Sequence, residues 1–168
     1  KPGALHSVND QYFQKVAAIE FTLNHDDGRN LKTLDEADII LVGISRTSKT
    51  PLSIFLSLKG YKVVNIPIIL NISLPEAIKE VNQRKIFALT IDPDALSLIR
   101  QNRLSKLGSS SSGDYADMKK VIEEINWAQG LFDANRKWPQ FNVTNKALEE
   151  TASEIIKHME SRKRNRFT

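Results

Sequence analysis

The most constraining feature of this 168-residue chain is a continuous apolar run, IILV, that leads directly into a glycine. Because its apolar residues do not alternate with polar ones, the run predicts a parallel strand at residues 38–42 that is buried on both faces. The loop GISRTSKTP follows at residues 43–51, and residues 50–59 have the composition of a helix with Pro51 in its first turn. The sequence therefore predicts a strand, a loop and a helix in direct succession.

The same alternation continues along the rest of the chain. A first helix is expected at residues 10–25, with Asp10 as its N-cap, and Asp92 is expected to cap a later helix that has Pro93 at its first position. Apolar periodicity predicts further strands at 61–69, 85–91 and 141–144, and further helices at 74–83, 92–104, 115–135 and 146–159. The alternation predicts a single α/β domain over residues 1–168, with a three-layer, P-loop kinase-like architecture in which helices cover both faces of a parallel sheet.

Two segments and one helix face carry more specific expectations. The low-complexity stretch GSSSSG at residues 108–113 predicts a flexible loop, and residues 161–168 form a basic tail. In the helix at 115–135, the residues expected to face the core are Met118, Val121, Ile122, Ile125 and Leu131.

Composition excludes several classes of protein. There is no cysteine, and His6, His25 and His158 do not have metal-ligand spacing, so neither a disulfide nor a structural zinc site is expected. No apolar run is long enough to cross a bilayer. Much of the net charge of +4 comes from the basic tail, which lacks interleaved aromatic residues, so neither a membrane nor a nucleic acid is the expected partner. No targeting segment is visible, which fits a cytosolic protein or a chain that starts inside a longer precursor.

The loop at 43–51 is the main candidate site. It begins and ends like a Walker A loop, but Ser48 stands where that pattern has its second glycine. Between a strand and a helix, the loop amides and the helix N-terminus would point at one phosphate-sized volume. Lys49 and Arg46 would bind phosphates and Thr50 could hold Mg²⁺, so the candidate binding residues are Gly43, Ser45, Arg46, Thr47, Ser48, Lys49 and Thr50. The alternative is an N-capping turn without a ligand.

Three charged residues outside the loop are further candidates. Asp27, which follows Asp26, would serve as the acid or base, although the DDG sequence is also typical of a turn at a helix C-terminus. Arg100 and Arg103, three residues apart on one helix, could close over the phosphates as a lid or could simply be solvated.

Several blocks of the sequence together resemble a known family. They are GISRTSKTPLSIFL, HDDGRN, GYKVVNIPI, VNQRKIFALTIDP, LIRQNRL and YADM, and with the initial KPG they run in order from about residue 1 to residue 159. The chain resembles the pyruvate, phosphate dikinase regulatory proteins and their bacterial relatives that act on phosphoenolpyruvate synthetase. GYKVVNIPI and the WPQFNVT block are more similar to the plant members.

The resemblance implies a bifunctional enzyme. Members of the family use ADP to phosphorylate a threonine beside the catalytic histidine of the dikinase, and they remove that phosphate with inorganic phosphate, releasing pyrophosphate. It implies ADP, AMP and the dikinase as partners, Mg²⁺ as a cofactor, a homodimer as one assembly, and the chloroplast stroma or the cytosol as the location.

Two departures from the family pattern accompany the resemblance. The family loop commonly has glycine at the position of Ser48, so one, both or neither activity is expected to remain. The family also has an N-terminal domain before KPG, so the chain looks like a C-terminal catalytic part. A non-catalytic nucleotide- or phosphate-binding module and a small-molecule P-loop kinase remain the alternatives.

Overall fold

The computed structural model describes residues 2–106 and 117–165. The predicted flexible loop at 108–113 and the last three residues of the basic tail lie outside the described residues. The elements in chain order are α1 (Pro2–Asn24), the 3-10 turns η1 (Asp26–Gly28) and η2 (Leu31–Glu36), β1 (Ile39–Gly43), α2 (Lys49–Ser57), β2 (Val63–Pro67), α3 (Ala77–Glu80), η3 (Gln83–Lys85), β3 (Ile86–Thr90), α4 (Pro93–Lys106), α6 (Met118–Ala134), β4 (Gln140–Asn142) and α7 (Leu148–Asn165).

The centre of the molecule is a parallel sheet of four strands in the order β2-β1-β3-β4. Ile40 of β1 lies opposite Val64 of β2 on one side and Ile86 of β3 on the other. All five residues of β1 are buried, as the continuous apolar run predicted. The prediction of an α/β fold built on a parallel sheet is confirmed.

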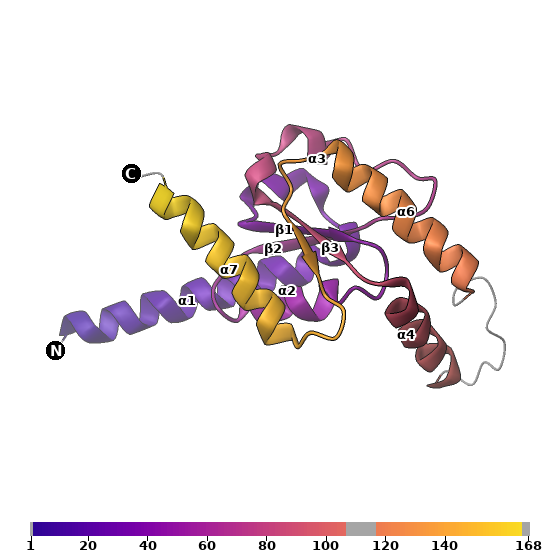
Figure 1. Ribbon diagram of the computed structural model, residues 1–168. Coiled ribbons are helices and arrows are strands. Elements are labelled where there is room, and N and C mark those ends of the chain that lie inside the picture. The colour runs from indigo at the N-terminus through magenta and orange to yellow at the C-terminus, as the bar shows by residue number, and fades with distance from the viewer. Residues whose placement is uncertain (1, 107–116, 166–168) are drawn as a thin grey trace.

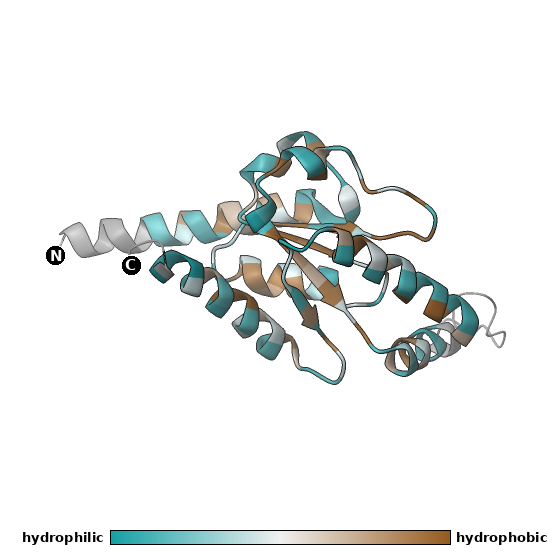
Figure 2. Cartoon of the chain, turned by 45° about the horizontal axis from the view of Figure 1, so that its top comes forward, coloured by the Kyte–Doolittle hydropathy of each residue, from teal (hydrophilic) through white to brown (hydrophobic). Residues whose placement is uncertain are grey.

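Helices cover both faces of this sheet (Figure 1). On one face, Leu52 and Leu56 of α2 and Ile155 of α7 pack on alternate residues of the strands, among them Ile39 and Phe87. On the other face, the packing residues come from α3, α6 and the segment before β4, and they include Ile78, Val121, Ala128, Phe132 and Trp138. Figure 2 shows apolar strands inside and mostly polar outer surfaces on α6 and α7. The predicted three layers are therefore present.

The first helix differs from its prediction. It begins at Pro2, so Asp10 lies inside the helix, and its assignment as the N-cap was wrong. Proline is well tolerated in the first turn of a helix, and nothing between Pro2 and Asp10 breaks the helical pattern strongly enough to stop it.

The helix predicted at residues 74–83 was also wrong in extent. It is reduced to the single turn α3, after which Val81 is extended at φ −79° and ψ 159°. The side chain of Asn82 then accepts a hydrogen bond from the backbone N–H of Arg84 and starts η3. Local turn formation by asparagine thus prevails over the apolar periodicity that favoured a longer helix.

The position of α6 corrects the predicted core face. Its N-cap is Asp117, whose side chain accepts from the N–H of Lys119. Val121 is buried as predicted, but Met118 and Ile122 are exposed, so their assignment to the core was wrong. The buried stripe of the helix continues instead through Ala128 and Phe132, one helical turn apart, and this rotates Met118 and Ile122 toward solvent.

Candidate functional site

The loop between β1 and α2 is closely packed at its start. A Cβ atom on Gly43 would lie 2.8 Å from Thr47 Oγ1 and 3.2 Å from the backbone oxygen of Leu89, so only glycine fits there without a shift. The buried Thr47 hydroxyl donates to the carbonyl of Ile44 at 2.8 Å and holds the loop closed. Gly43 and Thr47 therefore determine the tight packing of the loop against β3.

Ser48 has the backbone conformation that a glycine would adopt without penalty. Its φ is 65° and its ψ is 24°, in the left-handed region, and its carbonyl accepts the N–H of Leu52 at 2.9 Å. Arg46 also has a positive φ, 68°. Each such residue costs about 1 kcal/mol relative to glycine. The loop thus keeps a tight, strained shape although serine replaces the glycine of the Walker pattern.

Lys49 is a buried cation within this loop. Its side chain is 7% exposed, and Nζ donates to the Ile44 carbonyl at 2.8 Å. Burial lowers the pKa of Lys49 to about 8; Asp27 and Asp26 raise it, while Arg46 and Arg100 lower it further. A buried ammonium group without a directly bonded carboxylate is favourable where an anion is to be bound.

Asn65 of β2 holds the segment that carries Asp26 and Asp27, opposite the loop. The buried Asn65 amide donates from Nδ2 to Asp26 Oδ1, and its Oδ1 accepts the backbone N–H of Asp27 at 2.9 Å. The hydroxyl of Thr50 donates to the same Asp26 oxygen at 2.9 Å. Asp27 has φ 57°, a left-handed conformation that this side-chain clamp supports. One asparagine therefore fixes the Asp26 carboxylate and the backbone of Asp27 relative to the start of α2.

The two arginines predicted to form a lid occupy different positions. Arg100 is fully buried, and its Nη2 donates to Oγ of Ser45 at 3.0 Å and to the Ser45 carbonyl at 3.3 Å. It also forms an ion pair with Glu124 of α6. Arg103, farther along α4, is exposed. Arg100 therefore supports the loop through Ser45 and links it to α4 and α6.

These residues surround a pocket of about 380 Å³. It is lined by Asp26, Asp27, Ser45, Arg46, Ser48, Lys49, Thr50, Pro51 and Ile99. The structure thus brings together most of the sequence-predicted site residues in one polar hollow. The predictions missed Asn65, Glu124 and Ile99. Asn65 could have been identified from the sequence, because it is the one polar residue within the apolar run VVNIPII.

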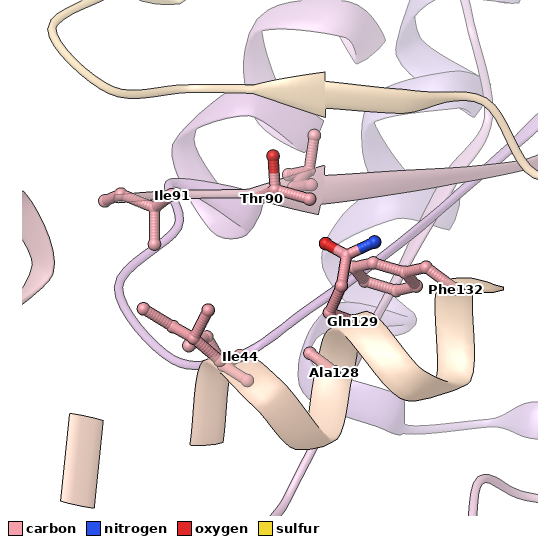
Figure 3. Close-up of a pocket in the computed structure, with 8 residues that line it drawn as sticks. Ile44, Thr90, Ile91, Ala128, Gln129 and Phe132 are labelled. Atoms are coloured by element: carbon pink, nitrogen blue, oxygen red, sulfur yellow. The ribbon is translucent and has the colours of Figure 1, made fainter. Parts of the chain in front are cut away.

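A second, smaller cavity lies beside the loop (Figure 3). Its volume is about 20 Å³, and Ile44 of the loop faces the end of β3 and the side chains of Ala128 and Phe132 from α6. This volume holds no more than a single water molecule, so it has no room for a nucleotide. The cavity marks where the first turn of the loop packs against α6.

The residues around Thr50 fit a magnesium ion that arrives with a phosphate. Within residues 2–106 and 117–165, no group of three or more His, Cys, Asp or Glu side chains could hold a metal ion by itself. Thr50 and Asp26 nevertheless offer a hydroxyl and a carboxylate oxygen in direct contact. Mg²⁺ prefers oxygen ligands and commonly uses one or two protein groups together with substrate phosphates.

Among the described helices, none is long and apolar enough to cross a membrane.

Comparison with known proteins gives consistent matches. Proteins named putative pyruvate, phosphate dikinase regulatory protein are 54% identical in Bdellovibrio bacteriovorus, over 95% of this chain and 57% of the relative, and 44% identical in Geobacter metallireducens, over 95% and 59%. The chloroplastic pyruvate, phosphate dikinase regulatory protein 1 of Arabidopsis thaliana is 45% identical, over 95% and 40%. The chain therefore spans little more than half the length of these bacterial relatives.

Residues 1–156 match the family model described as kinase/pyrophosphorylase. In agreement with the resemblance noted in its sequence, the chain belongs to the kinase/pyrophosphorylase family.

Proposed function

We propose that this chain is the catalytic part of an ADP-dependent kinase and phosphate-dependent phosphorylase that acts on a threonine of pyruvate, phosphate dikinase. Membership of the kinase/pyrophosphorylase family and the names of the relatives support this reading. The observation that carries it is the buried Lys49, which lies in a strained loop at the start of a helix and faces two carboxylates across a polar pocket.

In the kinase direction, the threonine oxygen attacks the β-phosphorus of ADP. A new oxygen–phosphorus bond forms, the bond from the β-phosphorus to the bridging oxygen breaks, and AMP leaves. Asp27, exposed at the pocket wall, accepts the hydroxyl proton. Lys49, Arg46 and the loop amides neutralise the phosphoryl oxygens as charge builds up.

In the phosphorylase direction, an oxygen of inorganic phosphate attacks the phosphorus of phosphothreonine. The bond to the threonine oxygen breaks, Asp27 passes a proton from the attacking phosphate to that oxygen, and pyrophosphate leaves. One pocket serves both directions, because each reaction moves a single phosphoryl group between the threonine oxygen and an oxygen of a second phosphate group.

Thr50 and Asp26 would hold Mg²⁺ together with the phosphates. The ion would supply positive charge between the phosphate groups. Asp26 Oδ1 already accepts hydrogen bonds from Thr50 and Asn65. We therefore assign Asp26 to holding Mg²⁺ and Asp27 to proton transfer.

The decisive experiment offers dikinase that carries phosphohistidine to this chain with ADP labelled at the β-phosphate or with ATP labelled at the γ-phosphate. The Arabidopsis relative serves as positive control. Label on the dikinase threonine with ADP is the expected result. Transfer from ATP alone would overturn the proposed donor. No transfer from either donor, while the control is active, would overturn the proposal and favour a phosphate-binding module without catalysis.

Two expectations about the cell and the assembly go with this function. We propose the chloroplast stroma as the location, with the cytosol as the alternative, because one of the relatives is chloroplastic. Immunoblots of stromal and cytosolic fractions decide between them. The predicted homodimer stays a prediction, and a sedimentation mass equal to one chain at micromolar concentration would refute it.

A further inference from the structure

A further pocket lies at the end of the sheet where β1 and β3 begin, opposite the phosphate loop. The loop follows the C-terminal end of β1, whereas this pocket is formed by residues that precede β1 and β3 and by the last turns of α7. Figure 1 shows that α7 ends on the side of the sheet away from α4. The pocket has a volume of about 260 Å³. It is therefore separate from the site described above.

The lining of this pocket is strongly basic. Arg84 and Lys85 come from η3, and Arg162 and Lys163 come from α7. Arg162 and Arg84 are 78 residues apart in the sequence and are in contact. Among the described residues that line the pocket, Asp38 is the single carboxylate against these four cations. One oxygen of Asp38 is already used, since it accepts the backbone N–H of Lys62 at 2.8 Å.

The hydrogen bonds of Lys85 and Arg162 go to neutral groups and do not compensate their charge. Lys85 Nζ donates to the backbone carbonyl of Asp35 at 2.8 Å, and Arg162 donates to the carbonyl of Arg84. A carbonyl satisfies an N–H group but carries no net charge. Burial and the neighbouring Arg84 both lower the pKa of Arg162, which reflects the crowding of like charges.

Arg162 is also held in place. Its guanidinium lies 5.5 Å from the ring centroid of Phe87, which is fully buried beneath it. The half-buried guanidinium therefore has a defined position, and a planar guanidinium in a fixed position is well suited to bind a phosphate or carboxylate through two parallel hydrogen bonds.

We propose that this basic pocket binds a small, multiply charged organic phosphate, independently of the nucleotide loop. Four cations from two distant segments match the charge of such a ligand, and the partly buried side chain of Met159 in the lining offers an apolar contact for a short carbon skeleton. The volume lies just below the roughly 300 to 1,000 Å³ of pockets for drug-sized molecules, which favours a compact metabolite over a nucleotide.

The test uses phosphoglycolate, which carries one phosphate and one carboxylate on two carbons, as the probe. Because the loop also attracts phosphates, the titration is done in a Lys49→Met background and followed by backbone amide NMR signals. We expect saturable shifts at Arg84 and Phe87, beside the basic pocket. The double variant Arg84→Gln, Lys163→Gln should weaken this binding by about tenfold or more, because each charge-assisted hydrogen bond is strong.

The matched control removes two other exposed cations, Lys137→Gln and Lys157→Gln, which are outside the pocket lining. It should leave the affinity within about twofold, because neither side chain lines the pocket and exposed charges are screened by salt. Arg84 and Lys163 are exposed, so their replacement is compatible with folding, which thermal melts check. Absence of saturable shifts near the basic pocket, or equal weakening in both double variants, would overturn the proposal.

Discussion

Replacing Lys49 by methionine should stabilise the ligand-free protein. Lysine and methionine have similar length, but only lysine places a charge in the 7%-exposed site. The lowering of the pKa of Lys49 from 10.5 to about 8 is dominated by this burial. A residue that weakens the fold in the absence of a ligand is expected where function needs an unpaired charge.

The size of the effect follows from the pKa change. A fall from 10.5 to about 8 corresponds to a cost of about 3 kcal/mol when Lys49 is protonated in both the folded and the unfolded state. Methionine also loses the hydrogen bond from Nζ to the Ile44 carbonyl, worth about 1 kcal/mol. The carbonyl keeps its bond from Thr47. The net gain at pH 7 is therefore about 2 kcal/mol.

The sign of the pH dependence gives a second check. Between pH 8 and pH 10.5 the folded protein binds fewer protons at Lys49 than the unfolded chain, so the wild type gains stability relative to the variant as pH rises. Urea unfolding in phosphate-free buffer, followed by tryptophan fluorescence, measures both proteins across this range. Lys79→Met, at an exposed lysine, is the control and should show neither effect. Equal or lower stability of Lys49→Met at neutral pH, or a difference that does not shrink with rising pH, would refute the reasoning.

Three further substitutions test the site. Asn65→Leu should lower the free energy of unfolding by about 2 kcal/mol or more and abolish phosphoryl transfer, because it removes the two hydrogen bonds that hold η1. Urea unfolding measures the stability and the dikinase assay measures the transfer. Retained activity would contradict the role assigned to Asn65. Gly43→Ala should cost about 1 to 3 kcal/mol and weaken ADP binding, because its Cβ would clash with Thr47; calorimetric binding equal to wild type would argue against it. Ser48→Gly should leave unfolding free energy equal or up to about 1 kcal/mol higher, with equal or higher transfer rates; a severe loss of rate would show that the serine side chain is itself required.

Local patterns in the sequence predict the central elements well. The apolar run before Gly43 can only be satisfied by a strand covered on both faces, and Pro51 marks the first turn of α2. The left-handed backbone of Ser48 also belongs to this short segment, because the Walker pattern has a glycine at that position. These features depend on residues that are close in sequence, and this is why they could be predicted.

Contacts between distant segments could not be predicted in this way. Asn65 lies 39 residues from Asp26, and its role depends on the pairing of β2 beside β1. Arg100 was expected in a lid, but it lies buried against Ser45 because Glu124 of α6 provides a counter-ion behind the loop. The helical pattern of α4 places Arg100 on a face, but the position of α6 determines what that face contacts.

The most direct test of the phosphate-site assignment is calorimetric titration of ADP at pH 8, in two buffers that differ in ionisation enthalpy. In the free protein about half of the Lys49 side chains are deprotonated at this pH. Bound phosphate should restore the charge, so we predict uptake of about half a proton per ADP bound. In Lys49→Met, both the proton uptake and most of the affinity should be lost. ADP binding with the same affinity and the same proton uptake in Lys49→Met would contradict the account.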